Sequence, residues 1–125
     1  MGTVIILLAV GAAAAVGAVA RYVLGQYVQY RSPGAFPRGT WLINVTGSFV
    51  LGLLVGLGAR HALPEQVVTI AGVGFCGAYT TFSTFSYELV HLCKKGQVGK
   101  SLLYAASSLA VGLAAAAAAL AIGSF

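Results

Sequence analysis

Charged residues are scarce in this sequence. Only 7% of its 125 residues are charged, and two Asp or Glu stand against seven Lys or Arg. A water-soluble domain of this length needs a largely polar exterior, because it cannot bury every apolar side chain. With 59% hydrophobic residues and a mean hydropathy of +0.94, the chain is therefore predicted to lie in a lipid bilayer.

Residues with reactive side chains are also few. Cys76 and Cys93 are too few and too far apart for a disulfide framework or a metal site, and packing roles are expected for both. His61 falls in a loop and His91 near a helix end, so no intramembrane haem or metal site held by such side chains is predicted. The sequence has neither a glycine-rich phosphate loop after a strand nor a nucleophile beside a base. The chain is therefore predicted not to be an enzyme.

The net charge of +5 comes from basic residues that are dispersed beside apolar runs. Nucleic-acid recognition depends on clustered Lys and Arg, so no nucleic-acid partner is predicted. Single basic residues beside apolar runs are typical of the cytoplasmic flanks of membrane helices.

Four apolar segments are long enough to cross a hydrocarbon core, which takes roughly 20 helical residues. They span residues 3–24, 39–59, 66–93 and 101–123, and short connections with Pro33, Pro37, Pro64 and Gly96 join them. Residues 1–125 are therefore predicted to form one all-α integral membrane domain of four transmembrane helices. The small residues before Arg21 resemble a signal-peptide cleavage site, but no positively charged region precedes them, so 3–24 is expected to remain as a helix.

The third segment is rich in residues that weaken a helix. Gly72, Gly74 and Gly77 precede a run of hydroxyl residues that extends from Thr80 to Thr84. Glycine destabilises a helix by about 1 kcal/mol relative to alanine, and Ser and Thr compete for backbone partners. Two alternatives follow: a glycine-rich helix that packs closely, or a helix broken near mid-membrane. Broken backbone survives in a bilayer only where protein buries it or where it lines a wet cavity.

Polar residues recur every four positions in the second and fourth segments, so each set lies on one helix stripe. These sets are Thr40, Asn44, Ser48, Gly52 and Gly56, and Tyr104, Ser108, Gly112 and Ala116. Either stripe alone could join helices through hydrogen bonds. Two such stripes beside a polar third segment favour a lined pathway.

The third segment also sorts its side chains by face. Phe82 and Phe85 share one side, where packing is the commoner role, although the positive edge of an aromatic ring can favour an anion. Thr81, Thr84 and Glu88 share another side. An acid near a membrane face is either a functional group or a partly solvated helix end.

Three stretches carry a specific set of motifs: GAVARYVLG (17–25), GTWLINVTGSFVLG (39–52) and GFCGAYTTFSTFSYE (74–88). The pattern GxxTTFSTFSxE, from Gly77 to Glu88, is the most specific of them. In order, spacing and four-helix layout, the whole chain resembles the Fluc (CrcB-type) fluoride channel family.

This resemblance implies an antiparallel, dual-topology dimer with two fluoride pores and a structural Na⁺ at the dimer centre. By matching position, Phe82 and Phe85 would line each pore and Asn44 would be its amide donor. The polar track would continue through Ser83, Thr84, Tyr104 and Ser108, with Glu88 at the vestibule end. Gly112 stands where relatives can carry a hydroxyl, so the polar track is expected to end sooner in this chain. Backbone carbonyls of Gly77 and Thr80 from both subunits would hold the Na⁺, and this would explain a broken helix.

The resemblance further implies passive export of cytoplasmic fluoride, and hence fluoride resistance, across the bacterial plasma (inner) membrane. Fluoride accepts hydrogen bonds and is strongly hydrated, so a pore must replace its water with donors. Hydroxyls, the Asn44 amide and ring edges would do so without a fixed cation that traps the ion. An inside-negative membrane potential would drive the anion outward, and no organic cofactor is expected.

The basic residues are unevenly divided between the two membrane sides. Arg21, Arg31, Arg38, Lys94, Lys95 and Lys100 fall on one side and only Arg60 on the other, which predicts both termini outside. Such a bias is unexpected for a chain that inserts in both orientations. An antiparallel homodimer, slightly favoured by the family, and a heterodimer with an oppositely biased homologue both stay open. Membrane lipid and fluoride are the other expected partners.

Two rival functions are weighed against the channel. A small multidrug-type proton-coupled exporter needs a membrane-embedded carboxylate, and residues 3–24 contain no acid. A non-transporting membrane assembly subunit would need only the Gly and Ala stripes, and it leaves the clustered hydrogen-bond donors unexplained. The fluoride channel is the function that the sequence predicts.

Overall fold

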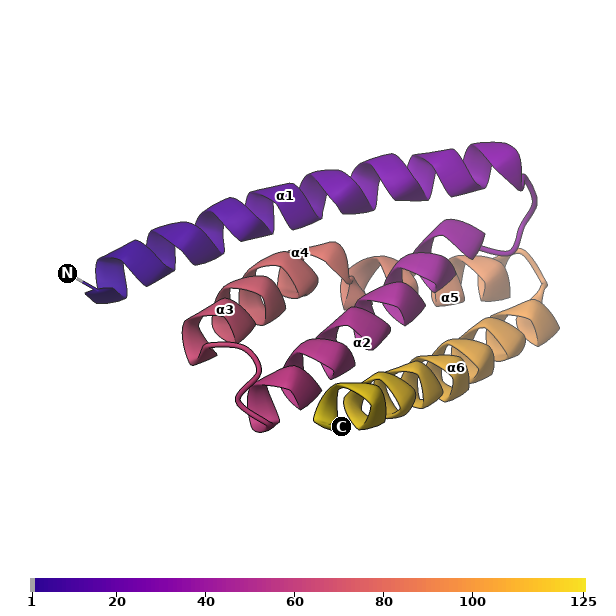
Figure 1. Ribbon diagram of the computed structural model, residues 1–125. Coiled ribbons are helices and arrows are strands. Elements are labelled where there is room, and N and C mark those ends of the chain that lie inside the picture. Colours follow the sequence, from indigo (N-terminus) through magenta and orange to yellow (C-terminus); the bar gives the residue numbers. More distant parts are fainter. Residues whose placement is uncertain (1) are drawn as a thin grey trace.

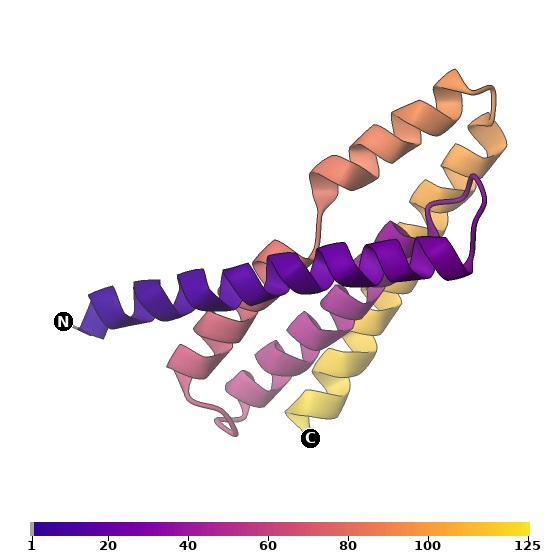
Figure 2. The same cartoon turned by 90° about the horizontal axis from the view of Figure 1, so that it is seen from above.

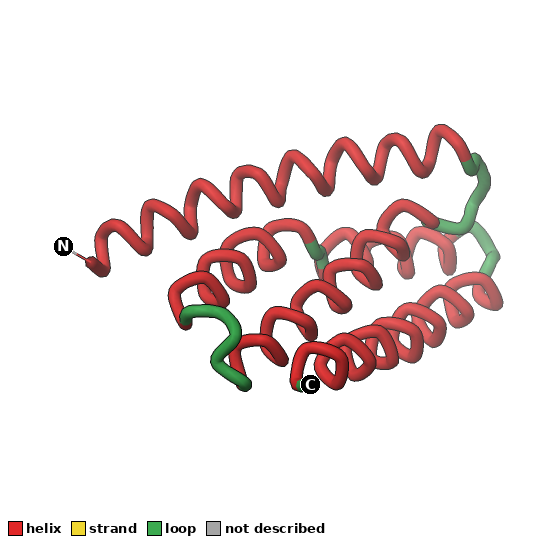
Figure 3. Tube along the Cα trace, in the orientation of Figure 1, coloured by secondary structure: helices red, strands yellow, loops and turns green. Residues whose placement is uncertain are grey.

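The structure, a computed structural model, describes residues 2–125, and helices form almost all of it (Figure 3). In chain order the elements are α1 (Gly2–Arg31), α2 (Arg38–Ala59), α3 (Glu65–Thr69), the π-helical stretch η1 (Ile70–Cys76), α4 (Gly77–Tyr79), α5 (Phe82–Lys94) and α6 (Val98–Ser124). Four spans are long and apolar enough to cross a membrane: α1, α2, the run from α3 to α5, and α6. The predicted all-helical, four-span architecture is confirmed.

The first span is longer than its apolar segment. α1 continues past residue 24 to Arg31, because Gln and Tyr are compatible with a helix even where hydropathy falls. Pro33 and Gly34 then follow, and Gly34 has φ +147°, a value that a side chain rarely tolerates. At about 1.5 Å per residue, 30 helical residues extend for about 45 Å, beyond a hydrocarbon core of about 30 Å. The last turns of α1 therefore reach the headgroup region.

The third span is interrupted. Its backbone is helical to Tyr79, becomes extended at Thr80 (φ −79°, ψ 158°) and Thr81 (φ −147°, ψ 122°), and is helical again from Phe82. Figure 2 shows α5 leaving this point along a different direction from α3 and α4. The structure thus contains an interrupted helix, and the glycine-rich part before the interruption also packs closely, since a Cβ at Gly74 would lie 2.8 Å from the Val10 carbonyl oxygen. The extended pair, Thr80 and Thr81, is called the break below.

Small residues let α2 and α6 pack backbone to backbone. A Cβ added at Gly56 would lie 2.6 Å from the Leu120 carbonyl oxygen, and one at Gly123 would lie 2.8 Å from that of Leu53. Gly52 meets the Ala116 backbone in the same way. The small halves of the two stripes therefore serve helix packing, as glycine commonly does between membrane helices.

Long, well-exposed α1 crosses the run from α3 to α4 (Figures 1 and 2). Gly74 makes the crossing possible, because a Cβ there would lie 2.8 Å from the Val10 carbonyl oxygen. The α1–α2 and α5–α6 connections lie at one end of the molecule, and the N-terminus, the C-terminus and the α2–α3 connection lie at the other (Figure 1). The first end, here named the basic end, carries Arg31, Arg38, Lys94, Lys95 and Lys100.

At the other end, the Arg60 Nε donates to the Gly123 carbonyl at 2.7 Å. Arg60 therefore caps the last turn of α6, where a cation also complements the helix dipole.

Candidate functional site

A side-chain amide takes the place of helical hydrogen bonds at the break. The Asn44 Nδ2 donates to the Thr81 carbonyl at 3.0 Å, and the Thr81 N–H donates to the Asn44 Oδ1 at 2.8 Å. In a continuous helix this N–H would bond to the Gly77 carbonyl, four residues earlier. The Gly77 carbonyl therefore loses its helical partner.

Thr81 then caps the second half of the span. Its side chain is buried, and its Oγ1 accepts from the Thr84 N–H and donates to the Thr84 Oγ1, both at 3.2 Å. This is an N-cap on α5, in which a hydroxyl replaces a backbone acceptor. Because the replaced acceptor would be the Thr80 carbonyl, this group also loses its helical partner. Gly77 and Thr80 are the two residues that were predicted to offer carbonyls to Na⁺.

α2 also holds the helical end that precedes the break. The Thr46 Oγ1 and the Tyr79 hydroxyl are hydrogen-bonded at 2.9 Å, and the Tyr79 side chain is buried. Gly47 lies directly against the break, because an added Cβ would overlap the Thr80 Cγ2. Asn44, Thr46 and Gly47 thus fix the two ends of the interrupted span against α2.

A cavity of about 300 Å³ opens beside the break, and Gly77, Thr80, Asn44 and Phe82 are among its lining residues. Within residues 2–125, no three His, Cys, Asp or Glu side chains gather closely enough to hold a metal. A cation at this place would therefore be held by oxygens of the backbone and of threonine. Carbonyl and hydroxyl oxygens suit a hard monovalent cation, so the residues present fit Na⁺.

Aromatic rings form a row that leads away from the break. The ring centroids of Phe82 and Phe85 are 6.1 Å apart with planes at 44°, and those of Phe85 and Tyr104 are 5.0 Å apart at 57°. The buried Tyr104 hydroxyl donates to the Glu88 Oε1 at 3.0 Å. Successive contacts therefore link four of the predicted pore residues. This set, here named the aromatic row, consists of Phe82, Phe85, Tyr104 and Glu88.

The first ring of this row is uncovered. Phe82 is 79% exposed, and the Ser83 and Thr84 beside it are exposed too. The Ser83 Oγ lies 3.4 Å from the Thr81 Oγ1, so its hydroxyl stays close to the break. One chain alone therefore leaves one face of the row open.

One predicted hydroxyl has no partner. The Ser108 Oγ is buried and makes no hydrogen bond among the described residues. A buried unpaired polar group costs about 1–3 kcal/mol, so a ligand or a solvent molecule is expected to meet it. Ser108 lies one helical turn from Tyr104, on the same stripe of α6. A Cβ added at Gly112, one turn further along, would lie 3.7 Å from the Ser48 Oγ, so this stripe of α6 continues against the stripe of α2.

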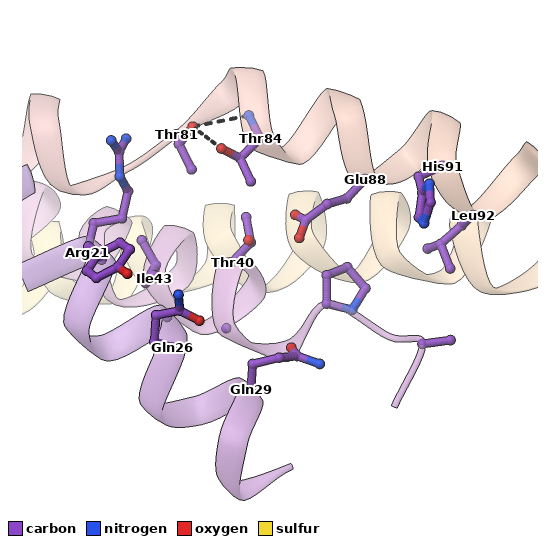
Figure 4. Close-up of a pocket in the computed structure, with 15 residues that line it drawn as sticks. Arg21, Gln26, Gln29, Thr40, Ile43, Thr81, Thr84, Glu88, His91 and Leu92 are labelled. Atoms are coloured by element: carbon purple, nitrogen blue, oxygen red, sulfur yellow. Dashed lines mark hydrogen bonds between the residues drawn. The ribbon is translucent and has the colours of Figure 1, made fainter. Parts of the chain in front are cut away.

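A second cavity, of about 350 Å³, lies between α1, α2 and α5 (Figure 4). Thr81, Thr84 and Glu88 all line it, so the face that the sequence assigned to these three residues is confirmed. Figure 4 shows the Thr40 side chain pointing toward the Glu88 carboxylate. Arg21 is also among the lining residues, so the cavity has a basic as well as an acidic residue in its wall.

Thr40, Thr81 and Arg21 were not among the predicted pore residues. Thr40 was detectable as the first member of its stripe, and Thr81 as a hydroxyl three residues before Thr84, which is the spacing of an N-cap. Nothing in the periodicity of 3–24 singles out Arg21 as a cavity residue. Its position depends on how α1 crosses the other helices.

Comparison with known proteins gives a consistent result. A family model described as CrcB-like protein, Camphor Resistance (CrcB), matches residues 8–120. A Leifsonia xyli subsp. xyli protein named Fluoride-specific ion channel FluC 1 is 48% identical over 114 residues, which are 91% of this chain and 83% of that protein. An Acidobacterium capsulatum protein named Fluoride-specific ion channel FluC is 47% identical over 102 residues, 81% of this chain and 82% of its own.

A third relative, Fluoride-specific ion channel FluC 1 of Streptomyces avermitilis, is 46% identical over 105 residues, 84% of this chain and 85% of its own. These relatives are named as channels, in agreement with the prediction that the chain is not an enzyme. Their bacterial sources and the four spans confirm a multi-pass protein of the bacterial plasma membrane. By the family model and by these identities, the chain belongs to the CrcB-like protein family.

Proposed function

We propose that this chain forms a fluoride-selective channel that conducts passively. The observation that carries the proposal is the unpartnered, buried hydroxyl of Ser108, one turn from the aromatic row. A hydrogen-bond donor without a protein partner, inside a membrane-spanning chain, suits an anion that only accepts hydrogen bonds. Relatives at 46–48% identity that are named fluoride-specific channels supply the ion.

Selectivity follows from what the pathway offers. The Ser83, Thr84 and Ser108 hydroxyls can donate, while the Asn44 amide keeps one N–H after its bond to Thr81. Ring edges of Phe82 and Phe85 add a weak positive field. Together these groups replace the hydration of a small anion without a fixed cation in the row, so the ion can enter and leave. Larger, less strongly hydrated anions gain less from such donors.

The exposed face of Phe82 supports an antiparallel dimer with two equivalent pores. Because the Phe82 ring is 79% exposed, one side of the pathway is uncovered in a single chain. A copy related by a two-fold axis would cover this side, and each chain would complete the pathway of the other. A homodimer requires the chain to insert in both orientations in spite of its basic end. A heterodimer with an oppositely charged homologue therefore remains the alternative.

We further propose a structural Na⁺ at the dimer centre, with the break near mid-membrane. The Gly77 and Thr80 carbonyls, released by the Asn44 and Thr81 bonds, would hold it from each subunit. When bound, such a cation supplies an electrostatic link between the two subunits. The residues of the chain do the rest: Asn44 fixes the extended backbone, and Gly47 leaves room for it.

Transport would be directed outward by the membrane potential. An inside-negative potential drives an anion out with about 2.3 kcal/mol per 100 mV for each charge. Arg21 in the second cavity attracts anions toward the row, while Glu88 is kept beside Tyr104 and Thr40. In this arrangement no step requires proton exchange.

Flux from liposomes tests the function. Purified protein in liposomes loaded with fluoride should release fluoride without any pH gradient, once a potassium ionophore clamps the potential. A fluoride electrode records the release, and matched liposomes loaded with chloride should retain their ion. Efflux that needs a proton gradient would favour the exporter, and no efflux would favour the assembly subunit; either result would refute the channel.

Replacing Ser108 with alanine separates conduction from folding. Because this hydroxyl makes no hydrogen bond within residues 2–125, its loss should leave thermal stability unchanged or slightly higher. Fluoride flux should fall about tenfold, the equivalent of one lost hydrogen bond of about 1.4 kcal/mol.

The neighbouring Ser107→Ala variant is the matched control for Ser108→Ala. The Ser107 Oγ accepts from the Trp41 Nε1 at 3.0 Å and donates to the Tyr104 carbonyl at 3.4 Å, so its loss should lower stability rather than flux. Equal flux in Ser108→Ala and in the unmodified protein would remove Ser108 from the pathway.

A further inference from the structure

A groove on the outside of the bundle, close to the basic end, is lined by none of the predicted pore residues. It has a volume of about 430 Å³ and lies where α1, α2 and α6 meet. α2 contributes Arg38, Trp41 and Leu42 to it, whereas Gly39, Thr40 and Ile43 of α2 line the second cavity. These two sets occupy opposite faces of the helix. α2 therefore lies between the groove and the second cavity, and the groove meets the aromatic row where the Phe36 ring packs edge-on against Tyr104 at 5.4 Å.

The walls of the groove are apolar. Val28 comes from α1, Phe36 from the α1–α2 connection, Leu42 from α2 and Leu103 from α6. Leu103 is 59% exposed, so the groove is open to the surroundings of the bundle. In a membrane those surroundings are acyl chains.

Arg38 is held in the groove with most of its donors unused. Its Nη1 donates to the carbonyls of Ser32 at 3.3 Å and Pro33 at 3.5 Å. The connection that carries these carbonyls is itself fixed, because the Gln29 Nε2 donates to the Gly34 carbonyl at 3.2 Å. A guanidinium has five N–H donors, so this side chain is pre-positioned and can still bind an anion.

The protein supplies no acid to neutralise this end. Of its two acids, Glu65 begins α3 at the opposite end, and Glu88 accepts a hydrogen bond from Tyr104 inside the bundle. The five basic residues of the basic end therefore need a counter-charge from outside the chain.

Aromatic residues set the depth of Arg38. The Trp41 indole lines the groove and donates to Ser107, and Tyr27 and Tyr30 are exposed on the last turns of α1. Trp and Tyr concentrate at the level of lipid headgroups. Arg38 begins α2 at this level, and Leu42, one turn further, lies deeper. The groove thus runs from a charged upper part to an apolar lower part.

We propose that this groove binds one anionic glycerophospholipid, with its phosphate on Arg38 and an acyl chain against Leu42 and Leu103. Guanidinium pairs with phosphate oxygens through two parallel hydrogen bonds, and basic pockets between membrane helices are typical sites for anionic headgroups. A free phosphate ion would match the charge and leave the apolar part of the groove unused. A zwitterionic lipid would fill the groove and bring a cation of its own to the basic end.

Lipid retention by the full-length, detergent-purified protein tests the proposal. In native mass spectrometry with phosphatidylglycerol and phosphatidylcholine of equal acyl length, the protein should retain the anionic lipid about tenfold better. Arg38→Gln should lower retention of phosphatidylglycerol about tenfold, to the level of phosphatidylcholine. The control Lys95→Gln removes one charge from an exposed position at the same end, outside the groove, and should change retention less than about twofold.

A second variant tests the acyl-chain part independently. Leu103→Trp fills the groove without changing any charge, so it should also lower retention of phosphatidylglycerol, while circular dichroism confirms the helical fold. Equal losses in Arg38→Gln and Lys95→Gln would mean diffuse surface charge and would overturn the proposal. It would also be overturned by unchanged retention in Leu103→Trp. Displacement of the lipid by millimolar inorganic phosphate would identify a free-anion site instead.

Discussion

Replacing Asn44 with alanine should reduce fluoride flux at least about 100-fold, a loss equivalent to about 2.7 kcal/mol. Alanine removes both hydrogen bonds to the Thr81 backbone, and an unpaired buried N–H or C=O costs about 1–3 kcal/mol. The lowest-energy alternative is a hydrogen bond from the Thr81 N–H to the Gly77 carbonyl, four residues earlier. With this bond the helix continues across the break. Reconstituted flux, measured beside the helical content, should show a folded protein that does not conduct.

Two further variants sharpen the Asn44 experiment. Asn44→Asp keeps an acceptor for the Thr81 N–H but cannot donate to the Thr81 carbonyl, so it should also fail to conduct. Ser48→Ala is the control on the same stripe, since the Ser48 Oγ donates to the Asn44 carbonyl at 2.8 Å, a bond within α2 that does not reach the break. Its flux should stay within about threefold of the unmodified protein.

The proposed Na⁺ gives this experiment a second readout. The melting temperature of the unmodified protein should be higher in a sodium salt than in the same salt of a large organic cation. Asn44→Ala should abolish that difference. If Asn44→Ala conducts normally and still responds to sodium, then the amide does not maintain the break.

Replacing Phe82 with isoleucine should lower fluoride flux about 100-fold, again near 2.7 kcal/mol, while the protein stays folded. Isoleucine keeps an apolar side chain but has no ring edge to face an anion. Because Phe82 is 79% exposed in the single chain, its ring contributes little to the packing of that chain. Loss of flux with unchanged thermal unfolding of the purified protein would therefore report on the pathway and not on stability.

Phe85→Ile should cause a similar loss of flux together with a moderate loss of stability, since the Phe85 ring also packs on Tyr104 at 5.0 Å. Phe49→Ile is the control, because Phe49 lies on α2, outside the aromatic row, and is 38% exposed. Liposome flux and thermal unfolding, measured on all three variants, separate the two effects. Unaltered flux in Phe82→Ile would leave both rings with a packing role alone.

The four spans could be predicted because hydropathy alone selects them. The end of α1 could not, since hydropathy falls after Leu24 whereas the helix continues until the Pro33–Gly34 turn. The π-helical stretch η1 could not be predicted either. It lies in a segment that is apolar on every side, so no periodicity distinguishes its wider turn from an α-helical one.

The sequence predicted which kinds of residue form the site, but it predicted fewer of the contacts between them. The hydroxyl run from Thr80 to Thr84 suggested a break, and the structure has one there. Asn44 was expected to face an ion, but its amide is bonded mainly to Thr81, 37 positions later in the chain. Such a pairing depends on how α2 packs against the third span. The sequence pattern of α2 alone contains no sign of it.

The break also creates a negative and a positive helix pole inside the third span. Peptide dipoles make the carbonyl end of a helix partly negative and its amide end partly positive. The run from α3 to α4 ends at Tyr79 and α5 begins at Phe82, so the two kinds of pole are separated by only two residues. A continuous helix of the same residues would cancel them internally. One interruption can thus attract ions of opposite sign without an ionised side chain, and a change that straightens the helix would remove both attractions together.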